Sequence, residues 1–170
     1  MNGQKLKYFK NKYVQSICSY CYLQKKKKLQ EAINSVLNQN YKPIELIIVN
    51  NNSYSIKMKK KLSGINIKVF NCFKNFKSAN GRNIGANFAN GSHLAFLDDD
   101  DVWDQNYLKT IHNAYKKNKR DVFVSKLYFY NKKKIYRNFI MESYEKTLNK
   151  IFLLNPGFAT SNVLIDKKIF

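Results

Sequence analysis

The chain has 170 residues, of which 44% are hydrophobic, and it carries a formal net charge of +20 at pH 7. This length and apolar content predict one globular domain and exclude a disordered tail. The apolar runs fall short of the roughly 20 residues that a membrane-spanning helix needs. An odd number of cysteines and a basic N-terminus without a signal-type apolar stretch predict a cytoplasmic protein, with the inner face of the membrane as an alternative.

Strands and helices alternate along the sequence. In chain order we predict a strand at 13–22, a helix at 26–38, a strand at 44–49, a short helix at 55–62, a strand at 65–70, a helix at 79–90, a strand at 93–97, a helix at 104–117 and a hairpin of 122–130 with 135–139. The helix at 79–90 is expected to turn Ile84, Phe88 and Ala89 inward. This alternation predicts an α/β fold with a mainly parallel sheet.

The positive charge has two interpretations. It is typical of proteins that bind nucleic acid, nucleotide phosphates or an anionic membrane surface. However, the lysine runs lie mostly between predicted elements and accompany abundant Asn, Ile, Phe and Tyr, as A/T-rich codons would produce. We therefore expect no nucleic-acid partner and keep peripheral contact with an anionic membrane surface as an alternative. The basic segment 1–12 would precede a single domain, 13–170.

Four consecutive aspartates, Asp98 to Asp101, directly follow the predicted strand at 93–97. Neighbouring carboxylates about 5 Å apart repel each other by roughly 3 kcal/mol at an effective dielectric constant of about 20. A hard divalent cation such as Mg²⁺ or Mn²⁺ would relieve this repulsion. The alternative is a solvated acidic turn that caps the following helix, because Asp favours helix N-termini. The aspartates alone leave both interpretations open.

A second polar loop, Asn50 to Ser53, follows the predicted strand at 44–49. Ligands of parallel α/β sheets bind beyond the carboxyl ends of the strands. Because both polar loops follow strands, we expect them to line one crevice.

Four segments, in this order and spacing, resemble the family 2 glycosyltransferases, which have the GT-A nucleotide-diphospho-sugar transferase fold. They are 29–41 (LQEAINSVLNQNY), 44–53 (IELIIVNNNS), 81–85 (GRNIG) and 90–103 (NGSHLAFLDDDDVW). The resemblance implies a three-layer α/β/α fold. It also implies metal-dependent, inverting transfer of a sugar from a nucleotide-diphosphate donor to a glycan or lipid-linked acceptor, as in polysaccharide biosynthesis.

The resemblance also implies roles for individual residues. The family's Asp-x-Asp signature falls on Asp98 and Asp100, which would bind Mn²⁺ or Mg²⁺ together with the donor diphosphate. Asp98 and Asp99 would contact the donor as well. Arg82 would pair with the base or the diphosphate, the alternative being an ordinary surface arginine.

Three departures from the family pattern bear on the function. Residues 21–24 (CYLQ) replace the Pro-x-Tyr-Asn type stretch that holds the base. Asn50 and Asn51, the predicted base-binding pair, stand where the family usually has Asp, so base binding would lack a carboxylate charge. The segment 156–170 resembles the start of the acceptor side, and the segment that supplies the general base would follow Phe170. The catalytic residue is therefore unknown, and we expect an incomplete acceptor side.

Three other functions remain as alternatives. A non-catalytic, truncated sugar-nucleotide-binding domain would keep the donor site without the base. A nucleotidyltransferase also uses strand-end aspartates, but it should carry a glycine-rich loop after its first strand, and 21–28 contains no glycine. A nucleic-acid-binding protein would interleave basic and aromatic residues on one face without an acidic cluster. The glycosyltransferase is the leading interpretation.

Overall fold

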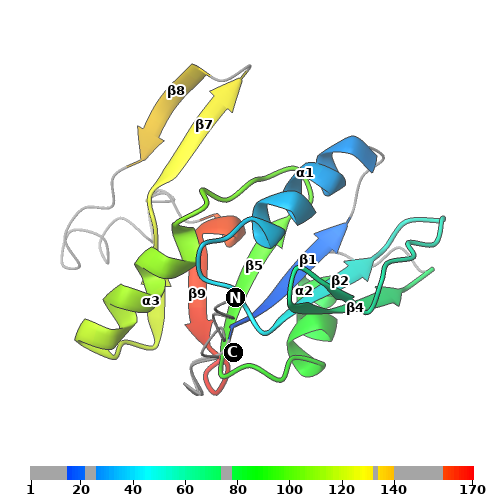
Figure 1. Ribbon diagram of the computed structural model, residues 1–170, viewed down its shortest axis with the longest axis horizontal. Helices are drawn as coiled ribbons and strands as arrows, with labels where there is room; N and C mark the ends of the chain where they lie inside the picture. The colour runs from blue at the N-terminus through cyan, green and yellow to red at the C-terminus, as the bar shows by residue number, and fades with distance from the viewer. Residues whose placement is uncertain (1–14, 22–25, 74–77, 132–133, 140–158) are drawn as a thin grey trace, which may run out of the picture.

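The structure, a computed structural model, describes residues 15–21, 26–73, 78–131, 134–139 and 159–170, so the basic segment 1–12 lies outside it (Figure 1). A seven-stranded sheet has the order β3-β4-β2-β1-β5-β9-β6, and β7 and β8 form a second, two-stranded sheet. The strands are β1 Gln15–Cys21, β2 Glu45–Asn50, β3 Lys61–Leu62, β4 Ile65–Asn71, β5 His93–Asp98, β6 Val122–Val124, β7 Leu127–Asn131, β8 Lys134–Phe139 and β9 Val163–Asp166. The helices are α1 Lys26–Leu37, α2 Ser78–Asn87, α3 Tyr107–Asn118 and the short 3₁₀ helix η1 Thr160–Asn162.

The four central strands, β4, β2, β1 and β5, are parallel, whereas β3 and β9 are antiparallel to their neighbours. From β1 the chain builds β2 and β4 on one side and then returns to place β5 on the other side. The strand order therefore reverses between β1 and β5. Ligands of open α/β sheets bind outside the carboxyl ends of the strands at such a point. Asp98, the last residue of β5, stands at this position.

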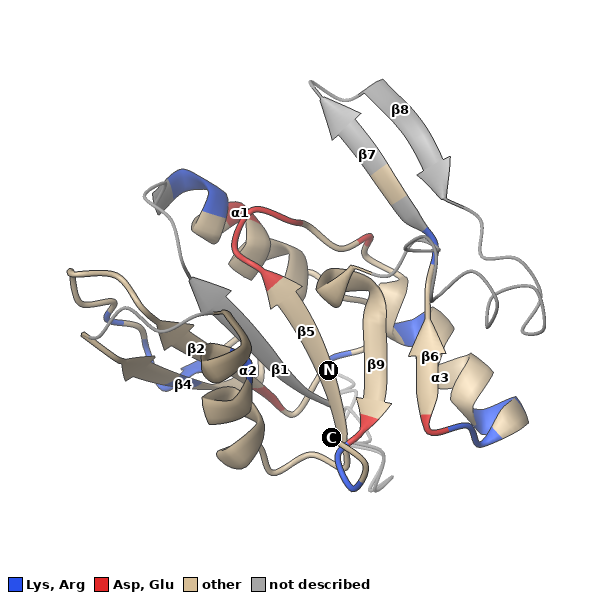
Figure 2. Cartoon of the chain, turned by 180° about the vertical axis from the view of Figure 1, so that it is seen from behind, with Lys and Arg blue, Asp and Glu red and all other residues tan. Residues whose placement is uncertain are grey.

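Helices cover both faces of the large sheet, with α1 and α3 on one face and α2 on the other (Figure 2). Side chains along a strand point alternately to the two faces. In β2, Leu46 and Ile48 belong to the core beneath α1 and α3, whereas Ile47 and Val49 belong to the core beneath α2. All four side chains are at most 1% exposed, as a strand buried on both faces requires. The predicted three-layer α/β/α fold is confirmed.

Helix α2 packs on β1 and β2. Its buried residues are Gly81, Gly85 and Ala86, whose small size lets the helix backbone lie close to the sheet. Phe88, which we expected to turn inward, is 53% exposed because α2 ends one residue before it. Its ring stacks on Phe70 of β4, with 4.4 Å between the ring centroids. The prediction for Phe88 was therefore wrong.

The helix predicted at 55–62 does not form. Ile56 and Met58 are half-buried against the core and the lysines that follow each of them are exposed, which is the alternation of an extended chain. The N–H of Ile56 donates to Asn71 Oδ1 at 2.9 Å, and Asn71 Nδ2 donates to the Ile56 carbonyl at 3.2 Å. β3 then pairs with β4 across a turn at 63–64, where φ is 49° and 81°. A side-chain amide distant in sequence thus satisfies backbone groups that a helix would have paired internally.

The hairpin predicted from 122–130 and 135–139 is correct only for β7 and β8. β6 instead joins the large sheet beside β9. The chain changes partner at Ser125, whose N–H donates to the Asn162 carbonyl at 2.9 Å and whose carbonyl accepts from Asn162 Nδ2 at 2.9 Å. Pairing with β9, far away in the sequence, therefore splits the expected strand.

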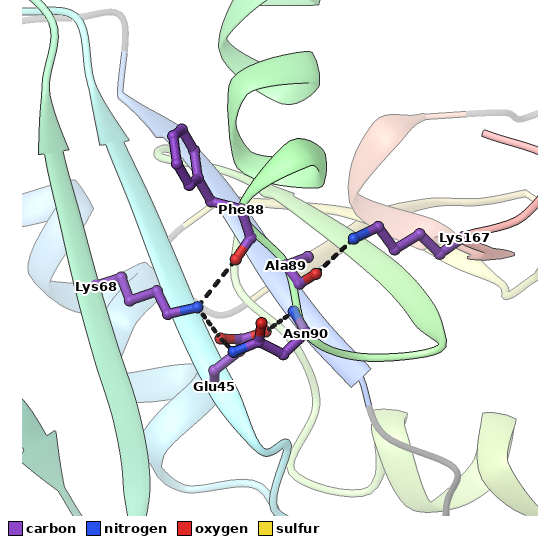
Figure 3. A network of polar contacts seen from close by, with 6 residues as sticks. All are labelled: Glu45, Lys68, Phe88, Ala89, Asn90 and Lys167. Atoms are coloured by element: carbon purple, nitrogen blue, oxygen red, sulfur yellow. Dashed lines mark hydrogen bonds and ion pairs between the residues drawn. The ribbon is translucent and has the colours of Figure 1, made fainter.

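A buried carboxylate organises a polar network at the amino end of β2 (Figure 3). Glu45 is 1% exposed, accepts the N–H of Asn90 at 2.5 Å and pairs with Lys68 Nζ at 2.7 Å. Lys68 Nζ also donates to the carbonyl of Phe88 at 2.9 Å, and Lys167 Nζ donates to the next carbonyl along the chain at 2.5 Å. Cations are favourable at the carbonyl end of a helix such as α2. This amino-end network (Glu45, Lys68, Asn90 and Lys167) fastens the loop between α2 and β5 to the sheet.

Candidate active site

Polar residues stand in a row at the carboxyl ends of the parallel strands. Asn71 of β4 pairs in register with Asn50 of β2, and Asn50 pairs with Cys21 of β1. Tyr20 of β1 pairs with Asp98 of β5. The two polar loops that follow β2 and β5 therefore lie at the same edge of the sheet, on either side of β1.

The acidic loop, Asp98 to Asp101, is held in place by η1. Ser161 Oγ accepts the N–H of Asp98 at 3.0 Å and donates to the carboxylate of Asp101. The Ser161 carbonyl accepts the Nε1–H of Trp103 at 2.6 Å, and both residues are buried. The N–H of Asp101 donates to the Asp98 carbonyl at 3.2 Å, which closes the turn. Ser161 thus fixes both ends of the loop to η1, which directly precedes β9.

Two cations face the acidic loop. Arg82 Nη2 lies 2.8 Å from Asp98 Oδ1, and Lys28 Nζ lies 3.8 Å from Asp100 Oδ2. Figure 2 shows the basic first turn of α1 beside this loop. The Arg82–Asp98 pair is partly buried, whereas the Lys28 and Asp100 side chains are 49% and 59% exposed. Arg82 Nε is buried and has no hydrogen-bond partner among the described residues, so this guanidinium retains an unused donor.

The electrostatics of the loop favour an additional cation. Burial raises the pKa of the Asp101 carboxyl above its ordinary value, and repulsion from Asp100 and Asp98 raises it further. The hydrogen bond from Ser161 and the charge of Lys28 act in the opposite direction. Among the described residues, Arg82 pairs with Asp98 and Lys28 pairs with Asp100, and the four adjacent carboxylates concentrate negative charge in this loop.

Asp98 and Asp100, the predicted metal ligands, offer oxygens of the kind that Mg²⁺ and Mn²⁺ prefer. Asp100 is exposed and Asp98 is half-buried. Within the described parts of the chain, no group of three or more His, Cys, Asp or Glu side chains is placed to hold an ion. An ion here would need further ligands such as phosphate oxygens and water, which is the usual coordination of Mg²⁺. The two carboxylates fit a metal that arrives with a diphosphate.

Asn50 is fully buried, and its side chain is engaged within its own loop. Its Nδ2 donates to the Tyr54 carbonyl at 2.6 Å and to Asn71 Oδ1 at 2.8 Å, and its Oδ1 accepts the N–H of Asn52 at 3.1 Å. An aspartate could donate neither of the first two hydrogen bonds. The amide at position 50 is therefore matched to Asn71 on the neighbouring strand. The predicted base contact of Asn50 stays a prediction, and the structure places its side chain as a support of the loop.

The other predicted donor contacts lie at the same edge of the sheet. Asn51 and Asp99 are half-buried in their respective loops. Arg82, which the sequence left open as a surface arginine, is bound to Asp98. The contacts of these residues with a donor stay predictions.

The sequence matches the family model of glycosyl transferase family 2 over residues 16–170. The chain belongs to this family. It is 29% identical over 143 residues to UDP-Glc:alpha-D-GlcNAc-diphosphoundecaprenol beta-1,3-glucosyltransferase WfgD of Escherichia coli, across 83% of this chain and 56% of WfgD. It is 26% identical over 141 residues to glycosyltransferase GlyA of Streptococcus pneumoniae, across 79% of this chain and 20% of GlyA.

Among solved structures, S. aureus TarS 1–349 matches this family 2 chain with a TM-score of 0.68 at 19% identity. The match covers 92% of this chain and 48% of the TarS chain. The predicted GT-A fold is confirmed. The chain spans from 20% to 56% of the length of the curated relatives that it matches. None of the described helices is both long and apolar enough to cross a membrane.

Three residues of the site were missed by reasoning from the sequence: Ser161, Asn71 and Lys28. Ser161 lies in a polar triplet that directly precedes an apolar strand, which is the signal that could have drawn attention to it. Asn71 ends a strand just as Asn50 does. Lys28 was interpreted as part of a compositional excess of lysine, and only its distance from Asp100 separates it from the other lysines.

Proposed function

We propose that this family 2 chain binds a nucleotide-diphospho-sugar at the carboxyl ends of β2, β1 and β5. As part of a glycosyltransferase, it would transfer the sugar with inversion to a hydroxyl of a glycan or lipid-linked acceptor. The observation that carries the proposal is the acidic loop at the reversal of strand order. There Asp98 is bound by Arg82, a cation of the kind that an anionic ligand would also approach.

We propose that Asp98 and Asp100 hold Mn²⁺ or Mg²⁺ together with the donor diphosphate. When bound, the ion would stabilise the negative charge that develops on the departing nucleoside diphosphate. Arg82 would orient Asp98 and pair with the diphosphate through its guanidinium group. Ser161 would keep the loop in place while its ligands exchange. The mutual repulsion of the adjacent carboxylates and their oxygen donors support this assignment.

The relatives favour a uridine nucleotide as the donor. TarS has been solved in complex with UDP and with UDP-GlcNAc, and both structures match this chain with a TM-score of 0.66. WfgD is named for UDP-Glc. We propose that Asn51, half-buried at the end of β2, contacts the base, and that Asn50 supports this contact from within the loop.

For the acceptor we propose a lipid-linked saccharide, because WfgD is named for an alpha-D-GlcNAc-diphosphoundecaprenol acceptor. Such an acceptor would bring the protein to an anionic membrane surface. Exposed lysines of the segment after β2 support peripheral contact of this kind; they are Lys57, Lys59, Lys60 and Lys61.

The donor site is tested by thermal unfolding with Mn²⁺ and UDP. A ligand that binds only the folded state raises the melting temperature, so Mn²⁺ and UDP together should do so for the parent chain. Asp100→Asn should abolish the rise and leave unfolding without ligands unchanged, because Asp100 is exposed.

Asp104→Asn is the matched control. Asp104 is an exposed aspartate outside the acidic loop, and its Oδ1 accepts the N–H of Asn106 at 2.8 Å, which an asparagine oxygen can also do. This variant should respond to Mn²⁺ and UDP as the parent does. If Asp100→Asn also responds like the parent, the metal assignment is wrong.

A further inference from the structure

The first turn of α1 is unusually basic for its position. Lys26, Lys27 and Lys28 open the helix, and no acidic residue accompanies them in that turn. The N-terminus of a helix carries partial positive charge, so cations there are unfavourable and anions are favourable. The arrangement is understandable if an anion lies in front of the helix. In the structure that anion is Asp100, whose Oδ2 lies 3.8 Å from Lys28 Nζ.

The Lys28–Asp100 pair is readily exchanged. Its atoms are farther apart than in the Arg82–Asp98 pair, and both of its side chains are about half exposed. Exposed pairs of this kind contribute little to stability because water competes for both charges. Lys28 is thus close enough to compensate Asp100, yet free to leave it when a stronger partner arrives.

We propose that Lys28 is the movable counter-ion of the donor site. It neutralises Asp100 while the site is empty, and it pairs with the donor diphosphate when a divalent cation occupies Asp100. This role rests on the proposed donor site.

The physical reason for the exchange is competition for one carboxylate. An ammonium group and a divalent ion at Asp100 would repel each other, so Lys28 opposes binding of the metal alone. A diphosphate that arrives with the metal supplies new negative charge within reach of the same ammonium group. Lys28 therefore opposes the metal and favours the metal–diphosphate complex.

The proposal predicts effects of opposite sign from one substitution. Lys28→Gln should bind Mn²⁺ alone about 2- to 5-fold more tightly than the parent, the range that an exposed ion pair can contribute. With Mn²⁺ saturating, the same variant should bind UDP and pyrophosphate about 2- to 5-fold more weakly. Pyrophosphate isolates the diphosphate contact from any contact with the base. If Lys28→Gln only disturbed the local structure, the variant would bind Mn²⁺ alone more weakly and would also bind UDP and pyrophosphate more weakly.

Isothermal titration of four proteins tests this: the parent chain, Lys28→Gln, Lys28→Arg and Lys27→Gln. Lys27 is exposed, precedes Lys28 in the same helical turn and makes no ion pair with a described residue, so its variant should match the parent in every titration. Lys28→Arg keeps the charge and should restore both affinities toward those of the parent.

Each outcome decides the matter. If Lys28→Gln and Lys27→Gln are alike while the parent binds Mn²⁺ and UDP, the role of Lys28 is wrong and the donor site stands. A loss of both affinities in Lys28→Gln also contradicts the exchange. If the parent binds neither Mn²⁺ nor UDP, the proposed donor site is wrong, and the proposed role of Lys28 is wrong as well.

Discussion

The two ends of the parallel sheet differ in how their carboxylates are paired. At the amino end, Glu45 is buried, receives a backbone N–H and pairs with Lys68 at 2.7 Å. At the carboxyl end, four aspartates follow one another in a single loop, and burial raises the pKa of Asp101. The amino-end network pairs its buried carboxylate within the protein, whereas the acidic loop concentrates adjacent carboxylates whose repulsion a cationic ligand would relieve.

This contrast teaches where each kind of residue acts. Substitutions in the amino-end network should change the free energy of unfolding and leave ligand binding alone. Substitutions in the acidic loop should change ligand binding and affect stability little. Two residues that support the polar loops, Asn50 and Ser161, should fall between these limits because they are buried yet adjacent to the proposed ligands.

The largest effect on stability is expected for Glu45→Ala. Removing the carboxylate leaves the N–H of Asn90 and the ammonium of Lys68 without their shared partner. Because Glu45 is buried and Lys68 is 34% exposed, the free energy of unfolding should fall by about 3 kcal/mol, the lower end of the range for breaking a buried pair. Urea denaturation measures the loss, and calorimetry should show an unchanged affinity for UDP with Mn²⁺. Glu45→Gln, which keeps an acceptor for Asn90, should lose less. A weaker UDP affinity in Glu45→Ala would break the proposed separation of the two ends.

Asn50→Asp should lower the free energy of unfolding by about 2 kcal/mol. The carboxylate cannot donate to the Tyr54 carbonyl or to Asn71 Oδ1, and it would lie buried against both oxygens. Urea denaturation again measures the change. Asn51→Asp is the matched control, because Asn51 is half-buried in the same loop and its variant should lose much less stability. Equal losses in the two variants would show that the match between Asn50 and Asn71 is unimportant.

Ser161→Ala should lower the free energy of unfolding by about 1 kcal/mol, the usual value of a hydrogen bond. It should also weaken UDP binding in the presence of Mn²⁺, because the N–H of Asp98 and the carboxylate of Asp101 lose their common partner. Thr160→Ala, in the same short helix, controls for a general loosening of η1. A Ser161→Ala variant that binds UDP and Mn²⁺ as the parent does would contradict the role of Ser161 in holding the loop.

The smallest effect is expected for Asp101→Asn. Because the pKa of Asp101 is raised in the folded state, the ionised carboxylate destabilises the fold at pH values above that raised pKa. The variant should therefore be more stable than the parent at neutral pH, by about 0.5 kcal/mol after screening by solvent. This advantage should shrink as the pH falls through the raised pKa toward the ordinary value of 3.8. Thermal unfolding from pH 7 to pH 4 measures it, and an advantage that grows on acidification would contradict the assignment.

The sequence by itself determined the central architecture. The apolar run of β2 and the strand before the acidic loop are each buried on both faces, so their composition alone indicates a parallel sheet between helices. The motif segments likewise identified the family, because their order and spacing can be recognised in the amino-acid sequence without the structure. Local patterns sufficed wherever neighbouring residues decide the structure.

Tertiary structure decided the partners of the loops. Segment 55–62 became extended because Asn71 binds the backbone at Ile56, and the acidic loop is fixed by Ser161 of η1, far away in the sequence. Lys28 could be assigned to the site only from the structure, in which the start of α1 lies beside the acidic loop. These contacts join residues far apart in the chain. Their hydrogen bonds and ion pairs stabilise the protein only when the folded sheet has brought the partners together.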